Sequence, residues 1–195
     1  MAVGLTLAVC VIGLCGCGPS RPEYQDPLSG LTTARGVDVS SDAPIRAGST
    51  VGLTFGSNVE RYLKHQDDGR KYAASVGASQ QLLSGNDPQY LVDRSVAILR
   101  RRYPKLKAVD DLATAERQRF STTFVLDIQI KHGLYPGDNT VVEIVIIALD
   151  AQQKPVSRLV GRGSITIRPY VEPNAREAMD EALLSLNAKA ETFLK

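Results

Sequence analysis

The chain has 195 residues, which is enough for one domain with a substantial hydrophobic core. Its 23 lysine and arginine residues nearly balance its 21 aspartate and glutamate residues, so the formal net charge is only +2. This balance excludes a nucleic-acid-binding protein that relies on a strongly basic surface, and the absence of tryptophan weakens the case for a sugar-stacking cleft.

Residues 1–16 form an uncharged, mostly apolar leader. The leader is too short to cross a bilayer core, which needs about 20 apolar residues, but it fits the apolar region of a signal peptide. A signal peptide normally opens with lysine or arginine, whereas the first basic residue here is Arg21. We therefore expect the true start to lie upstream of Met1.

The leader ends in Leu14-Cys15-Gly16-Cys17, which resembles a bacterial lipobox. The chain has three cysteines, and Cys17 alone follows a small residue and has an apolar residue three positions before it. We predict that Cys17 is acylated and becomes the new N-terminus. Acylation consumes its thiol, so we expect no disulfide, no thiolate metal site and no cofactor other than the covalent lipid.

Residues 17–48 are predicted to be the lipidated cysteine followed by a flexible tether. The segment is rich in proline, serine, glycine, aspartate and arginine and shows no apolar periodicity. A coil of this length has a root-mean-square reach on the order of 30 Å. A single domain is then expected over residues 49–195.

The first half of this domain begins with alternating residues at 51–55, which predict a strand. The polar region from Ser57 to Gln80 is predicted to be a long loop or an irregular helix, and its length makes it the leading candidate for a functional insertion. Asp87 and Pro88 open a helix that ends before Pro104. Its predicted buried stripe is Val92, Val96, Leu99 and Tyr103.

A short strand at 105–109 and a small helix capped by Asp110-Asp111 lead into a three-strand meander. The alternation along residues 124–131 predicts a strand with one buried and one mostly polar face. Residues 141–149 are almost wholly apolar and predict a central strand, with turns at 135–139 and 150–154. In the third strand, 156–168, Gly161 and Gly163 suggest a bulge or bend.

Asn174 is predicted to cap a final helix with a buried stripe of Met179, Leu183, Leu186, Ala190 and Phe193. The element order predicts an α+β fold with two layers. We expect a mainly antiparallel sheet of about four to five strands with two long helices on one face.

The charged features offer few candidates for chemistry. The basic cluster comprises Arg100, Arg101, Arg102, Lys105 and Lys107. This cluster could contact anionic lipid headgroups or an acidic polysaccharide, or it could be a solvated helix end that offsets the helix dipole. Asp67-Asp68 could supply paired carboxylates for acid–base catalysis, but we favour the interpretation that they are simply solvated.

His65 and His132 are far apart in sequence, and neither has a partner at metal-ligand spacing. We therefore expect no metal site, no catalytic residues and no enzyme activity.

The lipobox, the polar spacer, the strand at 51–55, the strand Thr123-Phe124-Val125-Leu126-Asp127-Ile128 and the closing alanine-rich helix together resemble small outer-membrane lipoproteins. These include the export lipoprotein of Pel-type polysaccharide systems, curli-secretion-like lipoproteins and auxiliary lipoproteins of ABC transporters. The resemblance implies a non-enzymatic accessory or scaffold role in an assembly, export or transport system.

The partners implied are envelope proteins or further copies of the chain, together with the membrane through the lipid anchor, and no nucleic acid. Gly18, the residue after Cys17, is not the aspartate that resembles an inner-membrane retention signal. This favours the periplasmic face of the outer membrane in a Gram-negative envelope. The alternative is a periplasmic binding module for a lipid or an anionic glycan, built from the basic cluster and the region from Ser57 to Gln80.

Overall fold

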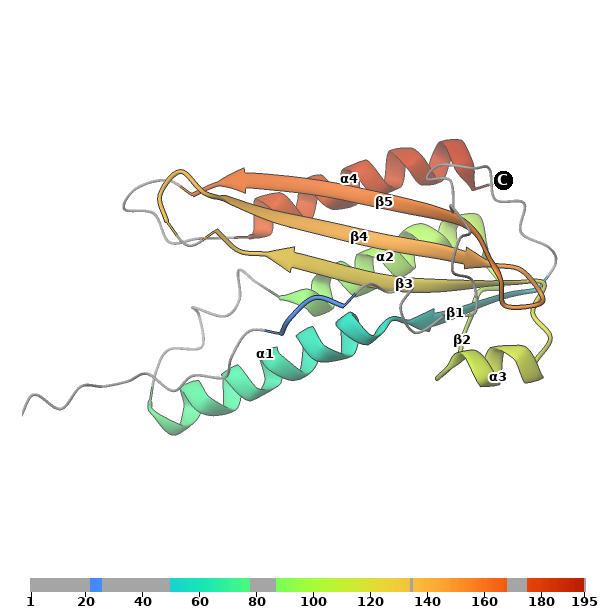
Figure 1. Ribbon diagram of the computed structural model, residues 1–195, viewed down its shortest axis with the longest axis horizontal. Helices are drawn as coiled ribbons and strands as arrows, with labels where there is room; N and C mark the ends of the chain where they lie inside the picture. The colour runs from blue at the N-terminus through green and yellow to red at the C-terminus, as the bar shows by residue number, and fades with distance from the viewer. Residues whose placement is uncertain (1–21, 26–49, 78–86, 134, 168–174, 195) are drawn as a thin grey trace, which may run out of the picture.

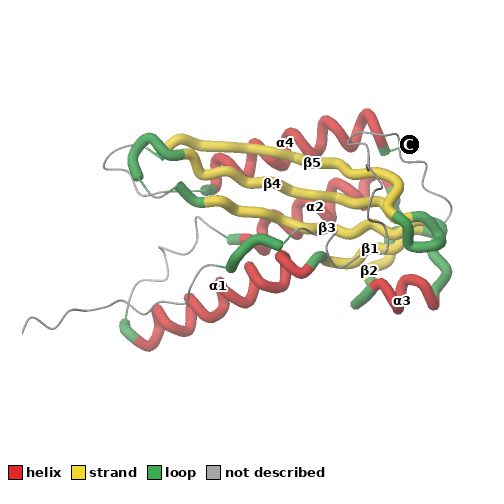
Figure 2. The backbone as a smooth tube through the Cα atoms, viewed as in Figure 1, coloured by secondary structure: helices red, strands yellow, loops and turns green. Residues whose placement is uncertain are grey.

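The computed structural model describes residues 22–25, 50–77, 87–133, 135–167 and 175–194, and it shows an α+β domain (Figures 1 and 2). A five-stranded sheet has the strand order β2-β1-β3-β4-β5. In chain order the elements are β1 (Val51–Phe55), α1 (Ser57–Ser75), α2 (Pro88–Arg102), β2 (Lys107–Ala108), α3 (Leu112–Arg117), β3 (Thr122–Lys131), β4 (Asn139–Leu149), β5 (Pro155–Thr166) and α4 (Arg176–Phe193).

The three long strands form the predicted antiparallel meander, and β4 lies inside it as expected. Its two turns are stabilised by aspartates. Asp138 accepts a hydrogen bond from the Tyr135 amide, and Gly137 adopts φ 95°, a conformation that glycine tolerates without strain. In the second turn, one carboxylate oxygen of Asp150 accepts hydrogen bonds from two later backbone amides.

The short strand β1 makes the sheet mixed, because it is parallel to both β2 and β3. A parallel neighbour requires a crossover connection, and the chain between β1 and β2 supplies one that contains α1 and α2. β1 has five residues whereas β3 has ten, so β1 accompanies only the first half of β3, from Thr122 to Leu126.

Two long helices, α2 and α4, lie on one face of the sheet, as predicted (Figure 1). Apolar side chains of β3 and β4, such as Phe124, Leu126, Ile144 and Ile146, form the main core beneath them. The predicted cap of α2 is confirmed, because the Asp87 side chain accepts a hydrogen bond from the Gln89 amide. The predicted cap of α4, at residue 174, lies outside the described residues.

Of the two alternatives for the region from Ser57 to Gln80, a long loop or an irregular helix, the helix is nearer to the structure, because residues 57–75 form the regular helix α1. Its buried residues are Asn58, Val59, Tyr62 and Gln66. They follow helical spacing, but two of them are polar amides. A hydrophobic pattern therefore barely shows the helix, although its geometry is ordinary.

The prediction of a polar, solvated face for β3 is wrong. Val125, Asp127 and Gln129 are buried, as are the alternate residues that face the helices. Val125 packs with Val145, Ile147 and Leu149 of β4 in a second, smaller apolar cluster, against which Leu112 of α3 also packs. β3 is thus covered on both faces, and its polar residues need partners inside the fold.

The expected bulge at Gly161 and Gly163 is also absent, because the register between β4 and β5 shifts only near Ala148 and Leu149. The two glycines instead let α4 approach the sheet. A Cβ atom on Gly161 would lie 2.4 Å from the Ala182 carbonyl oxygen, and one on Gly163 would lie 2.1 Å from the Ala178 carbonyl oxygen. These contacts are with helix backbone, which has little freedom to move away.

Replacing Gly161 with valine should therefore separate α4 from β5. We expect the free energy of unfolding to fall by about 3 kcal/mol, measured by urea denaturation. Arg162→Ala is the matched control, because this neighbouring side chain is exposed and its ion pair with Glu143 contributes little to stability. Equal stability of the two variants would contradict the role given to Gly161.

Candidate functional site

The basic cluster predicted from the sequence lies at the end of α2 and in the segment that follows it. All five side chains, Arg100, Arg101, Arg102, Lys105 and Lys107, are exposed. The structure does not gather them into one site. Only Arg100 and Arg101 line a groove in the helical layer.

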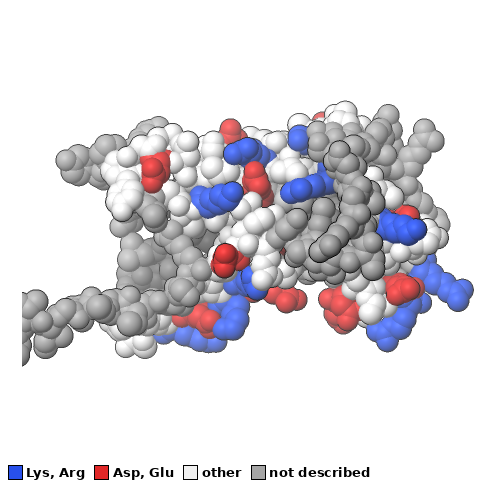
Figure 3. Space-filling model, viewed as in Figure 1, with Lys and Arg blue, Asp and Glu red and all other residues white. Residues whose placement is uncertain are grey.

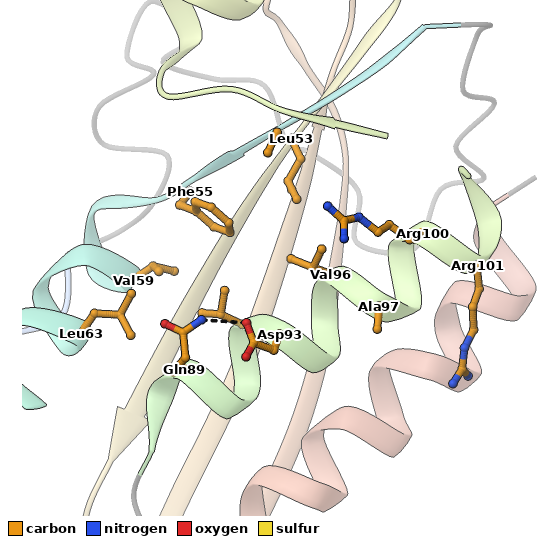
Figure 4. Close-up of a pocket in the computed structure, with 12 residues that line it drawn as sticks. Leu53, Phe55, Val59, Leu63, Gln89, Asp93, Val96, Ala97, Arg100 and Arg101 are labelled. Atoms are coloured by element: carbon orange, nitrogen blue, oxygen red, sulfur yellow. Dashed lines mark hydrogen bonds between the residues drawn. The ribbon is translucent and has the colours of Figure 1, made fainter. Parts of the chain in front are cut away.

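This groove has a volume of about 740 Å³ and lies between β1, β2, α1 and α2 (Figure 4). We call it the α1–α2 groove. Its apolar lining comes from four elements: Leu53 and Phe55 of β1, Val59 and Leu63 of α1, Val92, Val96 and Ala97 of α2, and Ala108 of β2. Phe55 is 37% exposed, although it belongs to a strand whose other residues are buried.

The polar groups of the groove are separated along α2. Arg100 extends toward Leu53, whereas Arg101 is turned the other way (Figure 4). Asp93 accepts a hydrogen bond of 2.7 Å from the Gln89 side-chain amide. Asp93 and Arg100 are seven positions apart in the sequence, so they lie about two helical turns, or roughly 10 Å, apart along the helix axis. The groove is therefore apolar along its length and oppositely charged at its two ends.

The unequal lengths of the strands create this groove. β1 ends at Phe55 and β2 has only two residues, so the sheet gives no further support beneath the space between α1 and α2. α1 begins directly after Gly56, whose amide donates a hydrogen bond of 2.8 Å to the Leu126 carbonyl. A Cβ atom on Gly56 would lie 2.4 Å from the Asp127 carboxyl carbon, so glycine permits this close approach.

Asp127 of β3 holds the first turn of α1 in place. Its carboxylate accepts hydrogen bonds from the Asn58 side-chain amide at 2.8 Å and from the Val59 backbone amide at 3.1 Å. The side chain is fully buried, and this burial raises the pKa of Asp127, while the hydrogen bonds that it accepts oppose the rise. An acidic residue from a distant strand thus acts as the N-terminal cap of α1.

The Tyr62 hydroxyl continues this contact along the unpaired half of β3. It accepts a hydrogen bond from the Ile130 amide and donates one to the Ile130 carbonyl. α1 thereby satisfies strand groups that β1 is too short to reach.

Residues 22–25 dock on the same helix, contrary to the prediction of a flexible tether throughout 17–48. Asn58 exchanges two hydrogen bonds with the Gln25 backbone, at 2.9 and 2.6 Å. Arg61 donates to the Glu23 carbonyl at 3.2 Å. Hydrophobic periodicity did not reveal this docking because the contacts use backbone groups and polar side chains.

The carboxylates of Asp67 and Asp68 lie on α1, and each pairs with a lysine four residues away. Lys71 pairs with Asp67, and the hydrogen bond from Lys64 lowers the pKa of Asp68. The structure therefore gives both carboxylates an ordinary helix-surface role.

Charged side chains of both signs are interspersed on the described part of the sheet face seen in Figure 3. Glu143 and Arg162 are register partners on β4 and β5 and form an ion pair at 3.5 Å. Within the described ranges, no three histidine, cysteine, aspartate or glutamate residues group as metal ligands would. No helix within these same ranges has the length and apolar character needed to span a bilayer. Cys17 lies outside them.

Neither a protein-family model nor a curated protein sequence matches the chain. Among solved structures, the chain is distantly similar to two forms of the PelC dodecamer from Paraburkholderia phytofirmans. A singly substituted form has a TM-score of 0.46 at 9% identity, covering 80% of this chain and 96% of its own. The other has a TM-score of 0.43 at 12% identity, covering 80% and 95% respectively. Similarity at this level carries no inference about ligands or assembly.

Replacing Asp127 with alanine should leave the Asn58 side-chain amide and the Val59 backbone amide without this acceptor in a buried site. We expect the free energy of unfolding to fall by about 3 kcal/mol in urea denaturation. Asp111→Ala is the matched control: Asp111 caps α3 through the Thr114 amide, but at the surface, so its replacement should lower stability less than that of Asp127. A smaller loss for Asp127→Ala than for Asp111→Ala would contradict the role given to Asp127.

Proposed function

We propose that this chain is a lipid-anchored envelope protein with a non-enzymatic accessory or scaffold role in an assembly, export or transport system. The anchor is the acylated Cys17, and the domain faces the periplasm from the outer membrane. One observation carries the anchor: Leu14-Cys15-Gly16-Cys17 places an apolar and a small residue at the two positions that a lipobox requires, directly after an apolar leader.

The docking of residues 22–25 supports an anchor that holds the domain close to the bilayer. Cys17 precedes Pro22 by five residues, and a fully extended chain of that length spans at most about 18 Å. Gln25 is hydrogen-bonded to Asn58 in the first turn of α1. The lipid would therefore enter the membrane near this end of α1, and partners would be met at the membrane surface.

Replacing Cys17 with serine should abolish labelling by an alkyne fatty acid and release the protein from the membrane fraction, because the acylated sulfur is lost. Cys15→Ser is the matched control and should leave labelling intact, since Cys15 lies two positions before the acylated residue. Labelling that survives in the Cys17 variant would mean that a different cysteine carries the lipid.

The accessory role predicts that the anchored protein joins a larger complex, made of other envelope proteins or of its own copies. Crosslinking in intact cells, followed by detergent extraction, should recover such a complex. A protein that stays monomeric and without partners under these conditions would contradict the scaffold role but not the anchor.

A second function, a binding module for a lipid or an anionic glycan, is favoured by one specific observation. Val59 and Leu63 from the region 57–80 line the same groove as Arg100 and Arg101 from the basic cluster. These two sequence regions are the ones from which such a module was predicted. The groove supports a lipid better than a glycan, because its lining is mainly aliphatic and offers few hydrogen-bonding groups.

A further inference from the structure

We infer that the α1–α2 groove holds an acyl chain of an anionic membrane phospholipid, with the phosphate of its headgroup at Arg100. This inference rests on the second proposed function, the binding of a lipid, and it names the ligand class, the site and the orientation. It is independent of the acylation of Cys17.

The lining of the groove matches a flexible hydrocarbon chain. Eight of its twelve lining residues are apolar, and its volume of about 740 Å³ lies within the range of small-molecule sites, roughly 300–1,000 Å³. Phe55 and Ala97 contribute exposed apolar surface to it. An acyl chain would remove this surface from water, which is the main source of affinity for such a ligand.

The charges at the two ends select an anionic head and fix its direction. Among the described residues, no carboxylate forms an ion pair with Arg100, so its guanidinium is available to a phosphate. Arginine suits this task because its donors match the geometry of phosphate oxygens. Asp93, two turns away on the same helix, disfavours an anion at the opposite end.

The position of the groove fits a ligand drawn from the bilayer. Asn58, which binds Gln25 of the docked segment, directly precedes Val59, which lines the groove. If Cys17 is the anchor, the membrane surface lies within reach of this turn of α1. A phospholipid could then enter the groove without crossing the aqueous phase.

The test uses the full chain carrying Cys17→Ser, so that no anchor tethers it to vesicles or competes for the groove. Vesicles that contain pyrene-labelled phosphatidylglycerol are mixed with the protein, and extraction of the lipid is followed as the loss of pyrene excimer emission. Pyrene-labelled phosphatidylcholine is the comparison lipid, because its headgroup has no net charge. We expect phosphatidylglycerol to be extracted and phosphatidylcholine to be extracted less well.

Two variants examine the two parts of the site. Arg100→Glu should weaken extraction by about tenfold or more, since it replaces a charged hydrogen-bond donor with a like charge. Ala97→Trp should weaken it similarly by filling the groove, and it should leave the fold intact because Ala97 is exposed. Arg102→Glu makes the same charge change in the same helical turn, outside the groove lining, and should alter extraction less than twofold.

Equal effects of Arg100→Glu and Arg102→Glu would overturn the inference, because they would show general attraction between a basic surface and an anionic bilayer. The Ala97→Trp variant is first checked for correct folding by thermal unfolding. If it then extracts lipid fully, the α1–α2 groove is not the binding site and the inference is overturned, although lipid binding itself would stand. If the chain that carries only Cys17→Ser extracts no lipid, both the inference and the second proposed function fail. The proposed lipid anchor is tested separately, by fatty-acid labelling at Cys17.

Discussion

The Asp127 carboxylate joins three segments that are distant in the sequence. It lies in β3, accepts hydrogen bonds from the first turn of α1, and through Asn58 is linked to residues 22–25. Burying an ionisable group is costly unless it is well paired, and these donors supply the pairing. The angle at which α1 leaves the sheet depends on this contact. The groove wall and the path of the N-terminal segment depend on it in turn.

The α1–α2 groove exists because two strands of the sheet are short, and not because the fold carries an additional element. β1 and β2 are short, so α1 must cover the rest of β3 and the space beside α2 remains open. Gly56 permits the close approach of α1, and Gly161 permits that of α4. Both glycines therefore set distances between layers, which is a packing role and not a flexible one.

The sequence predicted the elements whose patterns are local and strong. The meander turns, the caps at Asp87 and Asp111 and the buried stripe of α4 follow from neighbouring residues, and the structure confirms them. α1 was harder to predict because polar residues anchor it. Asp127 was interpreted as facing solvent for a different reason: the alternation of residues shows that a strand has two faces, but it does not show whether another element covers the polar face.

Among the groove residues, only Arg100 and Arg101 were predicted individually as contacts for an anionic partner, although Val59 and Leu63 lie in the region 57–80 that was named with them. The remaining lining residues come from four elements that meet only in the folded chain. Phe55, an aromatic residue at the end of a short strand, was the one available signal of an exposed apolar surface there.

The parallel position of β1 also makes the first strand of the sheet depend on a segment far along the chain. β1 pairs with β3, and Asn58 in the first turn of α1 binds Asp127 of β3, in each case about 70 residues later in the chain. The β3–β4–β5 meander and α4, by contrast, are formed from consecutive segments. Pairing between distant segments is slow, because the entropy of loop closure is lost before the stabilising contacts form. In a chain synthesised from its N-terminus, β1 and α1 therefore emerge before the segment that forms their partner strand β3.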